Sequence, residues 1–95
     1  MAVAVVQEWP VEDRSTANYD AINKRIEADG VPEGLILHSA GFAGDRFRIF
    51  DVWETKEDFD RFMADRLMPA VEAVVPADAQ PPDLKTYELH NVITP

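Results

Sequence analysis

Residues 46–63, RFRIFDVWETKEDFDRFM, constrain the fold of this chain most, because they read as a strand that turns directly into a capped helix. Apolar side chains occupy both alternating sets of the strand, and a strand of that kind is normally covered on both faces. Thr55 is a suitable N-cap, and the acidic turn after it suits the helix dipole. Phe59, Phe62 and Met63 then follow at the spacing of one buried helical stripe. We therefore expect a helix on one face of this strand and a further layer on the other.

The bulk composition limits the class of protein. The 95 residues make one domain, residues 1–95, and a hydrophobic content of 46% suits a folded core. A net charge of -9 disfavours nucleic acid and anionic membrane surfaces as partners. The chain has no cysteine for a disulfide or a thiolate site, and we expect neither a signal peptide nor a membrane span. A cytoplasmic protein is the expectation.

The remaining pattern predicts an alternating order of elements. Strands are expected over 2–9, 34–40, the stretch around 46–54 and 84–93, a helix over 17–29 and a second helix after Thr55, with connections over 11–14, 41–44 and 76–83. Pro69 should kink or restart the second helix, which continues over 70–75, and Gly30 is placed as a helix C-cap. This β-α-β-β-α-β order is that of the α+β ferredoxin-like fold.

A ferredoxin-like fold leaves one sheet face bare. Right-handed crossovers place both helices on one face of a four-stranded antiparallel sheet. The other face must then carry either Phe50 and Val52 or Phe47 and Ile49, and the sequence leaves that choice open. Because a large apolar face is a liability on a monomer, we expect a homodimer formed through this sheet face.

The segments DVWETKEDFDRF and GLILHSAG resemble the dimeric α/β-barrel superfamily, in particular the antibiotic-biosynthesis-monooxygenase-like small proteins. The resemblance implies a dimeric α/β barrel with a pocket between sheet and helices, lined by Trp53. Members of the superfamily include cofactor-independent oxygenases of phenolic polyketides, haem-degrading enzymes, isomerases and cyclases. The haem-degrading pattern has a ligating His on the second helix where this chain has Met63, and neither predicted helix contains a His. We therefore expect no haem and no other cofactor.

His38 and Asp51 are the candidate catalytic pair. Asp51 and Trp53 are two residues apart on a strand, so they share a face. Across the hairpin, His38 is expected to face either Phe47 or Arg48, and only the first register puts it on the face of Asp51. In that register the carboxylate would orient the imidazole and raise its basicity, as a general base requires. Alternatively, His38 is structural, with its ring satisfied by a backbone carbonyl.

Further residues are candidates for the pocket wall. Trp53, Phe59, Phe62 and Met63 would form its apolar side, although Trp53 could equally be core. Tyr19 could project into the pocket or hold down the first helix. His90 shares a strand face with Glu88, and which face that is stays open. The spacing of the two histidines matches no metal motif, so no metal site is expected.

These residues favour a small cofactor-independent monooxygenase acting on an aromatic or polyketide-like molecule. A deprotonated phenol or activated carbon can itself donate an electron to O₂, so the protein needs an apolar pocket and a base. One alternative is a non-catalytic dimeric ligand-binding or accessory protein, and another is a cyclase or isomerase with the same pocket. A cavity of roughly 300 Å³ or more beside Trp53 would favour the enzymes.

Overall fold

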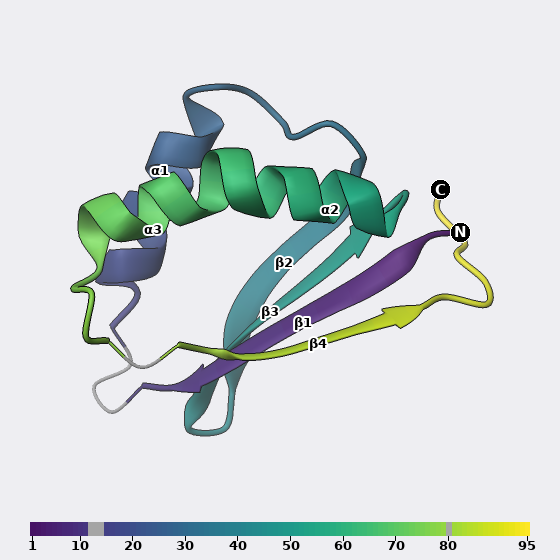
Figure 1. Ribbon diagram of the computed structural model, residues 1–95. Helices are drawn as coiled ribbons and strands as arrows, with labels where there is room; N and C mark the ends of the chain where they lie inside the picture. The colour runs from purple at the N-terminus through teal and green to yellow at the C-terminus, as the bar shows by residue number, and fades with distance from the viewer. Residues whose placement is uncertain (12–14, 80) are drawn as a thin grey trace.

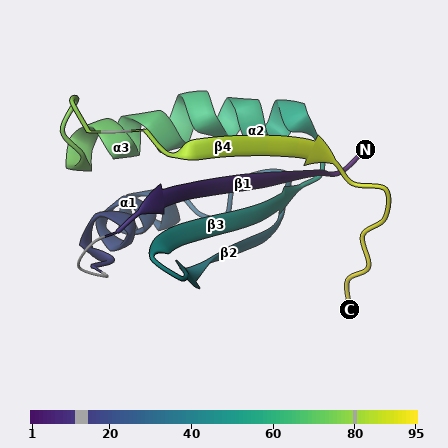
Figure 2. The same cartoon turned by 90° about the horizontal axis from the view of Figure 1, so that it is seen from below.

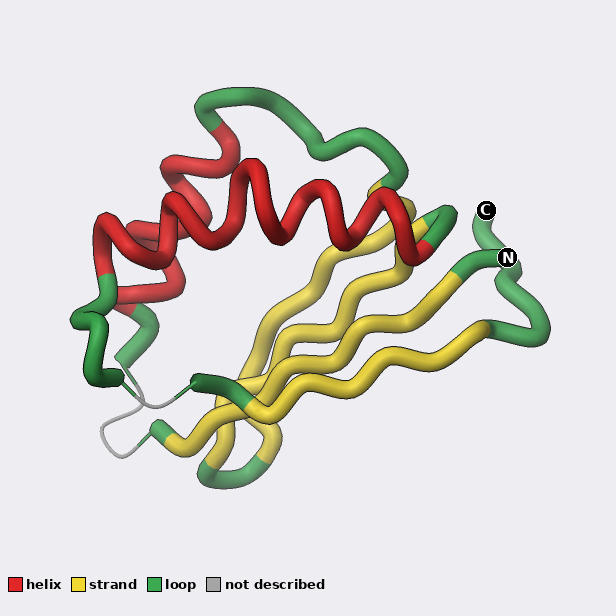
Figure 3. The backbone as a smooth tube through the Cα atoms, in the orientation of Figure 1, coloured by secondary structure: helices red, strands yellow, loops and turns green. Residues whose placement is uncertain are grey.

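The computed structural model describes residues 1–11, 15–79 and 81–95, and it shows a four-stranded antiparallel sheet with helices on one face (Figures 1 and 3). The elements are β1 (Val3–Pro10), α1 (Ala17–Glu27), β2 (Leu35–Ala43), β3 (Arg46–Trp53), α2 (Lys56–Phe62), η1 (Met63–Leu67), α3 (Met68–Val74) and β4 (Asp83–Glu88). The strand order is β2-β3-β1-β4, which Figure 2 shows side by side. The predicted ferredoxin-like fold is confirmed. Residues 12–14 of the predicted connection over 11–14, and residue 80 of the loop over 76–83, lie outside the described residues.

The alternating residues of β3 point to the two opposite faces of the sheet. β3 pairs with β2 on one side and β1 on the other, so it lies inside the sheet and not at an edge. Phe47, Asp51 and Trp53 point toward the helices, since Trp53 contacts helix α2 through aromatic rings. Phe50 therefore lies on the face away from the helices, which resolves the choice that the sequence left open.

The β2–β3 hairpin is longer than predicted, and this sets the register. The turn expected over 41–44 is wrong, because β2 continues to Ala43 and the hairpin turns at Gly44 and Asp45. Gly44 has φ +66°, which suits the first central position of a tight hairpin turn. His38 consequently lies opposite Asp51, not Phe47 or Arg48. His38 nevertheless shares a sheet face with Asp51, as the first of the two expected registers required.

The long helix passes through Pro69 without a break. Its start is capped as predicted, because the Asp58 backbone N–H donates to Thr55 Oγ1 at 3.1 Å. The π-helical turn η1 comes directly before α3, whose first turn contains Pro69. Proline cannot donate the regular helical hydrogen bond, and a wider turn accommodates its ring. The kink or restart expected at this proline is replaced by a local π-helical turn.

Helix α1 is tied to the second helical segment through its C-terminal end. It stops at Glu27, two residues earlier than predicted, and Gly30 follows with φ +84° as the expected cap. Arg66 in η1 donates from Nη2 to the carbonyls of Ile26 and Gly30 at 2.6 and 2.7 Å. The guanidinium thus adds a second donor to the Ile26 carbonyl, which also accepts the Asp29 N–H, and it bonds the carbonyl of Gly30 just beyond the helix. Among the described residues, none of the helices has the length and apolar character that crossing a bilayer requires.

The last strand is shorter than the predicted span 84–93. Glu88 pairs with Val3, the first residue of β1, so the chain beyond has little strand left to pair with. One more bond, from the Leu89 N–H to the Ala2 carbonyl at 2.9 Å, ends the ladder. His90 therefore lies in an exposed tail that leaves the sheet beside the N-terminus (Figure 1). The expectation that His90 shares a strand face with Glu88 is therefore wrong, because β4 ends at Glu88.

Replacing Gly34 by Ala should destabilise the fold by about 1–2 kcal/mol, since Gly34 has φ +87°. A Cβ there would also meet the Asp58 side chain within 2.4–2.6 Å. Gly41→Ala is the matched control, because its Cβ meets nothing within 4 Å. Gly30→Ala carries the backbone cost without the contact. Urea unfolding measures all three, and a Gly34→Ala variant as stable as Gly41→Ala would contradict this packing.

Candidate functional site

A cavity of about 460 Å³ opens where the end of β1 meets the first turn of α1. Its described lining comprises Trp9, Pro10, Val11, Ser15, Ala17, Asn18, Tyr19 and Phe47. Phe47 is the centre of an aromatic cluster, with ring centroids 5.3 Å from Trp9 and 5.2 Å from Tyr19. None of these described lining residues carries a formal charge at neutral pH. The described lining therefore offers a ligand three aromatic rings together with the polar side chains of Ser15 and Asn18.

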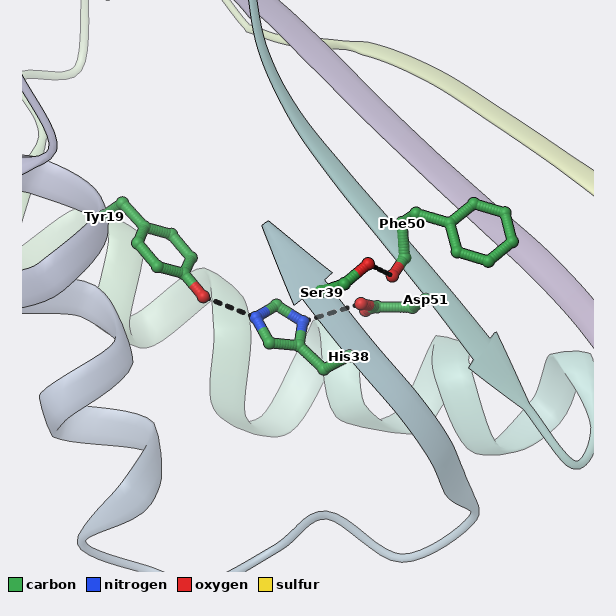
Figure 4. Close-up of polar contacts among 5 residues, drawn as sticks. All are labelled: Tyr19, His38, Ser39, Phe50 and Asp51. Carbon is green, nitrogen blue, oxygen red and sulfur yellow. Dashed lines mark hydrogen bonds and ion pairs between the residues drawn. The ribbon is translucent and has the colours of Figure 1, made fainter. Parts of the chain in front are cut away.

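A hydrogen-bonded chain of side chains reaches this cavity from the sheet (Figure 4). Asp51 Oδ1 lies 2.6 Å from His38 Nδ1, and the Tyr19 hydroxyl lies 2.5 Å from His38 Nε2. The Asp51 side chain is only 6% exposed, whereas that of His38 is 32% exposed. The chain thus runs from a buried carboxylate on β3, through an imidazole on β2, to a phenol on α1.

The buried carboxylate fixes which imidazole nitrogen carries the proton. A carboxylate can only accept, so His38 Nδ1–H donates to Asp51. In the neutral imidazole, Nε2 then presents its lone pair to Tyr19, whose hydroxyl donates to it. When His38 is protonated, Nε2–H donates to the Tyr19 oxygen instead. In neutral His38, Nε2 is therefore a basic atom that accepts the hydrogen bond of the Tyr19 hydroxyl.

The surroundings shift both partners away from their ordinary titration ranges. The hydrogen bond that His38 donates to Asp51 raises the pKa of His38 above 6.5, against the opposing effect of burial. Burial raises the pKa of Tyr19 above 10.0, and the negative charges of Asp51 and Asp20 raise it further. The pair is accordingly a strengthened base beside a phenol that stays protonated near neutral pH.

Trp53 and the helix residues predicted with it form the core and do not line this cavity. Trp53 is 0% exposed and belongs to a cluster with Val3, Val5 and Phe59. Phe62 and Met63 pack against the same cluster. The expected pocket beside Trp53, closed by these residues, is therefore replaced by packing, and the cavity lies toward the other end of β3, at Phe47.

The structure thus brings together three of the predicted site residues. His38, Asp51 and Tyr19 are hydrogen-bonded, whereas His90 is in the exposed tail near the start of β1, at the end of that strand opposite to the cavity. Sequence reasoning missed Trp9, which lines the cavity at the end of β1. Its position directly before Pro10, where the predicted strand stops, was the available signal.

Two other features bear on what the site can bind. Within the part of the chain that the structure describes, no group of three or more acidic, His or Cys side chains is arranged to hold a metal ion. A second hollow of about 310 Å³ is lined in part by Ser39, Gly41, Arg48 and Phe50. Those four residues belong to the sheet face away from the helices, so this hollow is separate from the His38 chain.

Comparison with solved structures identifies proteins with the same fold. Rv0793 from Mycobacterium tuberculosis matches with a TM-score of 0.73 and 13% identity over 99% of this chain and 100% of that one. A candidate antibiotic biosynthesis monooxygenase from Chloroflexus aurantiacus matches with a TM-score of 0.72 and 11% identity over 99% and 98%. SnoaB, a cofactor-independent oxygenase from Streptomyces nogalater, matches with a TM-score of 0.69 and 16% identity over 97% and 96%.

These likenesses confirm the predicted resemblance at the level of the fold. The chain has the ferredoxin-like fold of the antibiotic-biosynthesis-monooxygenase-like proteins. No protein-family model matches the sequence, and no curated protein matches it either.

The His38–Asp51 contact predicts a definite pH dependence. In an NMR titration the pKa of His38 should lie above 6.5, and Asp51→Asn should lower it, because the carboxylate is the main cause of the shift. The stability that protonated His38 adds is then fully present below about pH 6.5 and is lost as the pH rises through the raised pKa. Urea unfolding across that window measures the loss. A pKa of His38 that Asp51→Asn leaves unchanged would contradict the assigned hydrogen bond.

Proposed function

We propose that this protein is a small cofactor-independent monooxygenase that acts on an aromatic or polyketide-like molecule. The observation that carries the proposal is the hydrogen-bonded chain from Asp51 through His38 to Tyr19, which ends at an aromatic-walled cavity. An oriented base beside a cavity that can hold an aromatic ring is what proton removal from a weakly acidic aromatic substrate needs. SnoaB, a cofactor-independent oxygenase with the same fold, supports the choice of reaction.

The reaction balances without a further reductant. His38 takes a proton from an activated CH₂ group of the substrate, and Asp51 stabilises the imidazolium that forms. The substrate anion gives one electron to O₂, and the resulting radical pair combines to a peroxide. The peroxide O–O bond then breaks as the carbon loses its second proton. One oxygen atom stays on the carbon as a carbonyl, and the other leaves as water.

Two alternatives use the same residues differently. A cyclase or isomerase would use the same base but consume no O₂. A non-catalytic ligand-binding or accessory protein would bind a ligand in the cavity without turnover. The packing of Trp53 into the core supports this alternative, because no deep pocket then forms beside Trp53 between sheet and helices. Oxygen consumption separates the monooxygenase from both alternatives.

Oxygen uptake with dithranol, an anthrone with an acidic methylene carbon, tests the proposal. The wild-type protein should consume one O₂ for each carbonyl product formed. His38→Ala should lower the rate by about 10²–10⁴-fold, the usual contribution of a general base. Asp51→Asn should lower it as well, because the imidazole loses its orienting partner. His90→Ala, in the exposed tail, is the matched control and should keep the wild-type rate. Binding of dithranol without oxygen uptake would favour the ligand-binding alternative.

We also propose that the protein is a homodimer held through the sheet face away from the helices. Strand pairing places Ala4, Val6, Leu37, Phe50, Val52 and Tyr87 on that face. Leu37 and Tyr87 are 48% and 51% exposed, so the face presents large apolar side chains to solvent in the single chain. A second copy related by a two-fold axis would cover this face with its own.

Replacing Phe50 by Asp should convert the dimer to a monomer, since a carboxylate would be buried without a partner at the interface. In sedimentation the wild-type protein should have about twice the 10.7 kDa mass of the chain. Met68→Asp is the control, because Met68 is an exposed apolar residue of the helical layer. A dimeric Phe50→Asp variant, or a monomeric wild type at micromolar concentration, would rule out this interface.

A further inference from the structure

Tyr19 is shared between the cavity and the hydrogen-bonded chain. It lines the cavity together with Trp9 and Phe47, and its hydroxyl bonds to His38 Nε2. His38 and Asp51 are absent from the described lining of the cavity. A ligand in the cavity therefore meets the Tyr19 side chain before it meets the imidazole, and Figure 4 shows the phenol pointing at the ring.

We propose that Tyr19 is a catalytic residue that relays the substrate proton to His38. The inference rests on the proposed function, because it assigns the route to the base used there. The Tyr19 oxygen accepts a proton from the bound substrate while its own hydroxyl proton moves to His38 Nε2. The products are a substrate anion, an unchanged phenol and an imidazolium paired with Asp51. No charge or proton is left over.

Packing holds the phenol in the position that such a relay needs. Its ring lies nearly parallel to the His38 ring, at 14° and 6.0 Å between centroids, and it contacts Phe47 at 5.2 Å. The tyrosine is therefore held by rings from both β2 and β3. A hydroxyl fixed at hydrogen-bond distance from a base transfers its proton without first searching for the geometry.

The electrostatic surroundings favour a concerted transfer. The pKa of Tyr19 is raised by burial and by nearby carboxylates, so a free tyrosinate would be an unfavourable intermediate. The phenol oxygen must receive the new proton as it releases the old one. Two protons then move in the same step, and one of them, the Tyr19 hydroxyl proton, exchanges with solvent, so the step is sensitive to D₂O.

Tyr19→Phe tests the relay, and Tyr87→Phe is its matched control. Phe keeps the ring contacts and removes only the hydroxyl, while Tyr87, the other tyrosine of the chain, lies on the opposite sheet face. The assay is anaerobic loss of deuterium from the methylene carbon of labelled dithranol, which reports proton removal independently of oxygen chemistry. Tyr19→Phe should slow the loss by about 10²-fold or more and leave dithranol affinity within a few-fold, whereas Tyr87→Phe should match wild type.

The outcomes separate the relay from the proposed function. In D₂O the wild-type rate should fall, because the Tyr19 hydroxyl proton that moves in the step exchanges with solvent, and the residual rate of Tyr19→Phe should show a smaller solvent isotope effect, since only the carbon-bound proton moves there. If Tyr19→Phe is as fast as wild type or faster while His38→Ala is slow, the substrate reaches His38 directly and the relay is wrong. If wild type exchanges deuterium but consumes no O₂, the relay stands and the monooxygenase does not. If bound dithranol exchanges no deuterium on wild type, both are wrong.

Discussion

The contact between His38 and Asp51 is the interaction on which the functional account depends. It joins the two strands of one hairpin, and it exists only because the turn falls at Gly44 and Asp45. A shift of one residue would turn His38 to the other sheet face, away from α1. The buried carboxylate would then lack its imidazole partner, and a buried charge without a partner is costly. The hairpin register therefore also determines whether the His38–Asp51 hydrogen bond can form.

The same sheet has different roles at its two ends. At the end carrying Trp53, aromatic and aliphatic side chains pack under α2 as a buried cluster. At the end carrying Phe47, the first turn of α1 and the end of β1 leave a cavity with aromatic walls. His38 and Asp51 lie between the two ends, so a proton taken up by His38 is held between the Tyr19 side chain that lines the cavity and the buried Asp51 carboxylate. The separation lets one small domain be both stably packed and open to a ligand.

The order of elements could be predicted from the sequence because it depends on local signals. Thr55 as a cap and Gly30 as a helix end are confirmed, and so is the shared face of His38 and Asp51. The exact register could not be predicted, since Gly41 and Gly44 are both good turn residues and only pairing across the whole hairpin selects one. The end of β4 could not be predicted either, because it is set by where β1 begins.

The position of the cavity could not be predicted from the sequence, for a different reason. Whether Trp53 lines a pocket or fills the core depends on how closely α2 packs against the sheet, a distance that no local pattern encodes.

The central claim, that His38 Nε2 is a base facing Tyr19, can be tested by the tautomer of His38. Above its raised pKa, long-range ¹H–¹⁵N NMR should show the proton on Nδ1, with Nε2 as the acceptor. A neutral His38 with its proton on Nε2 would contradict the account.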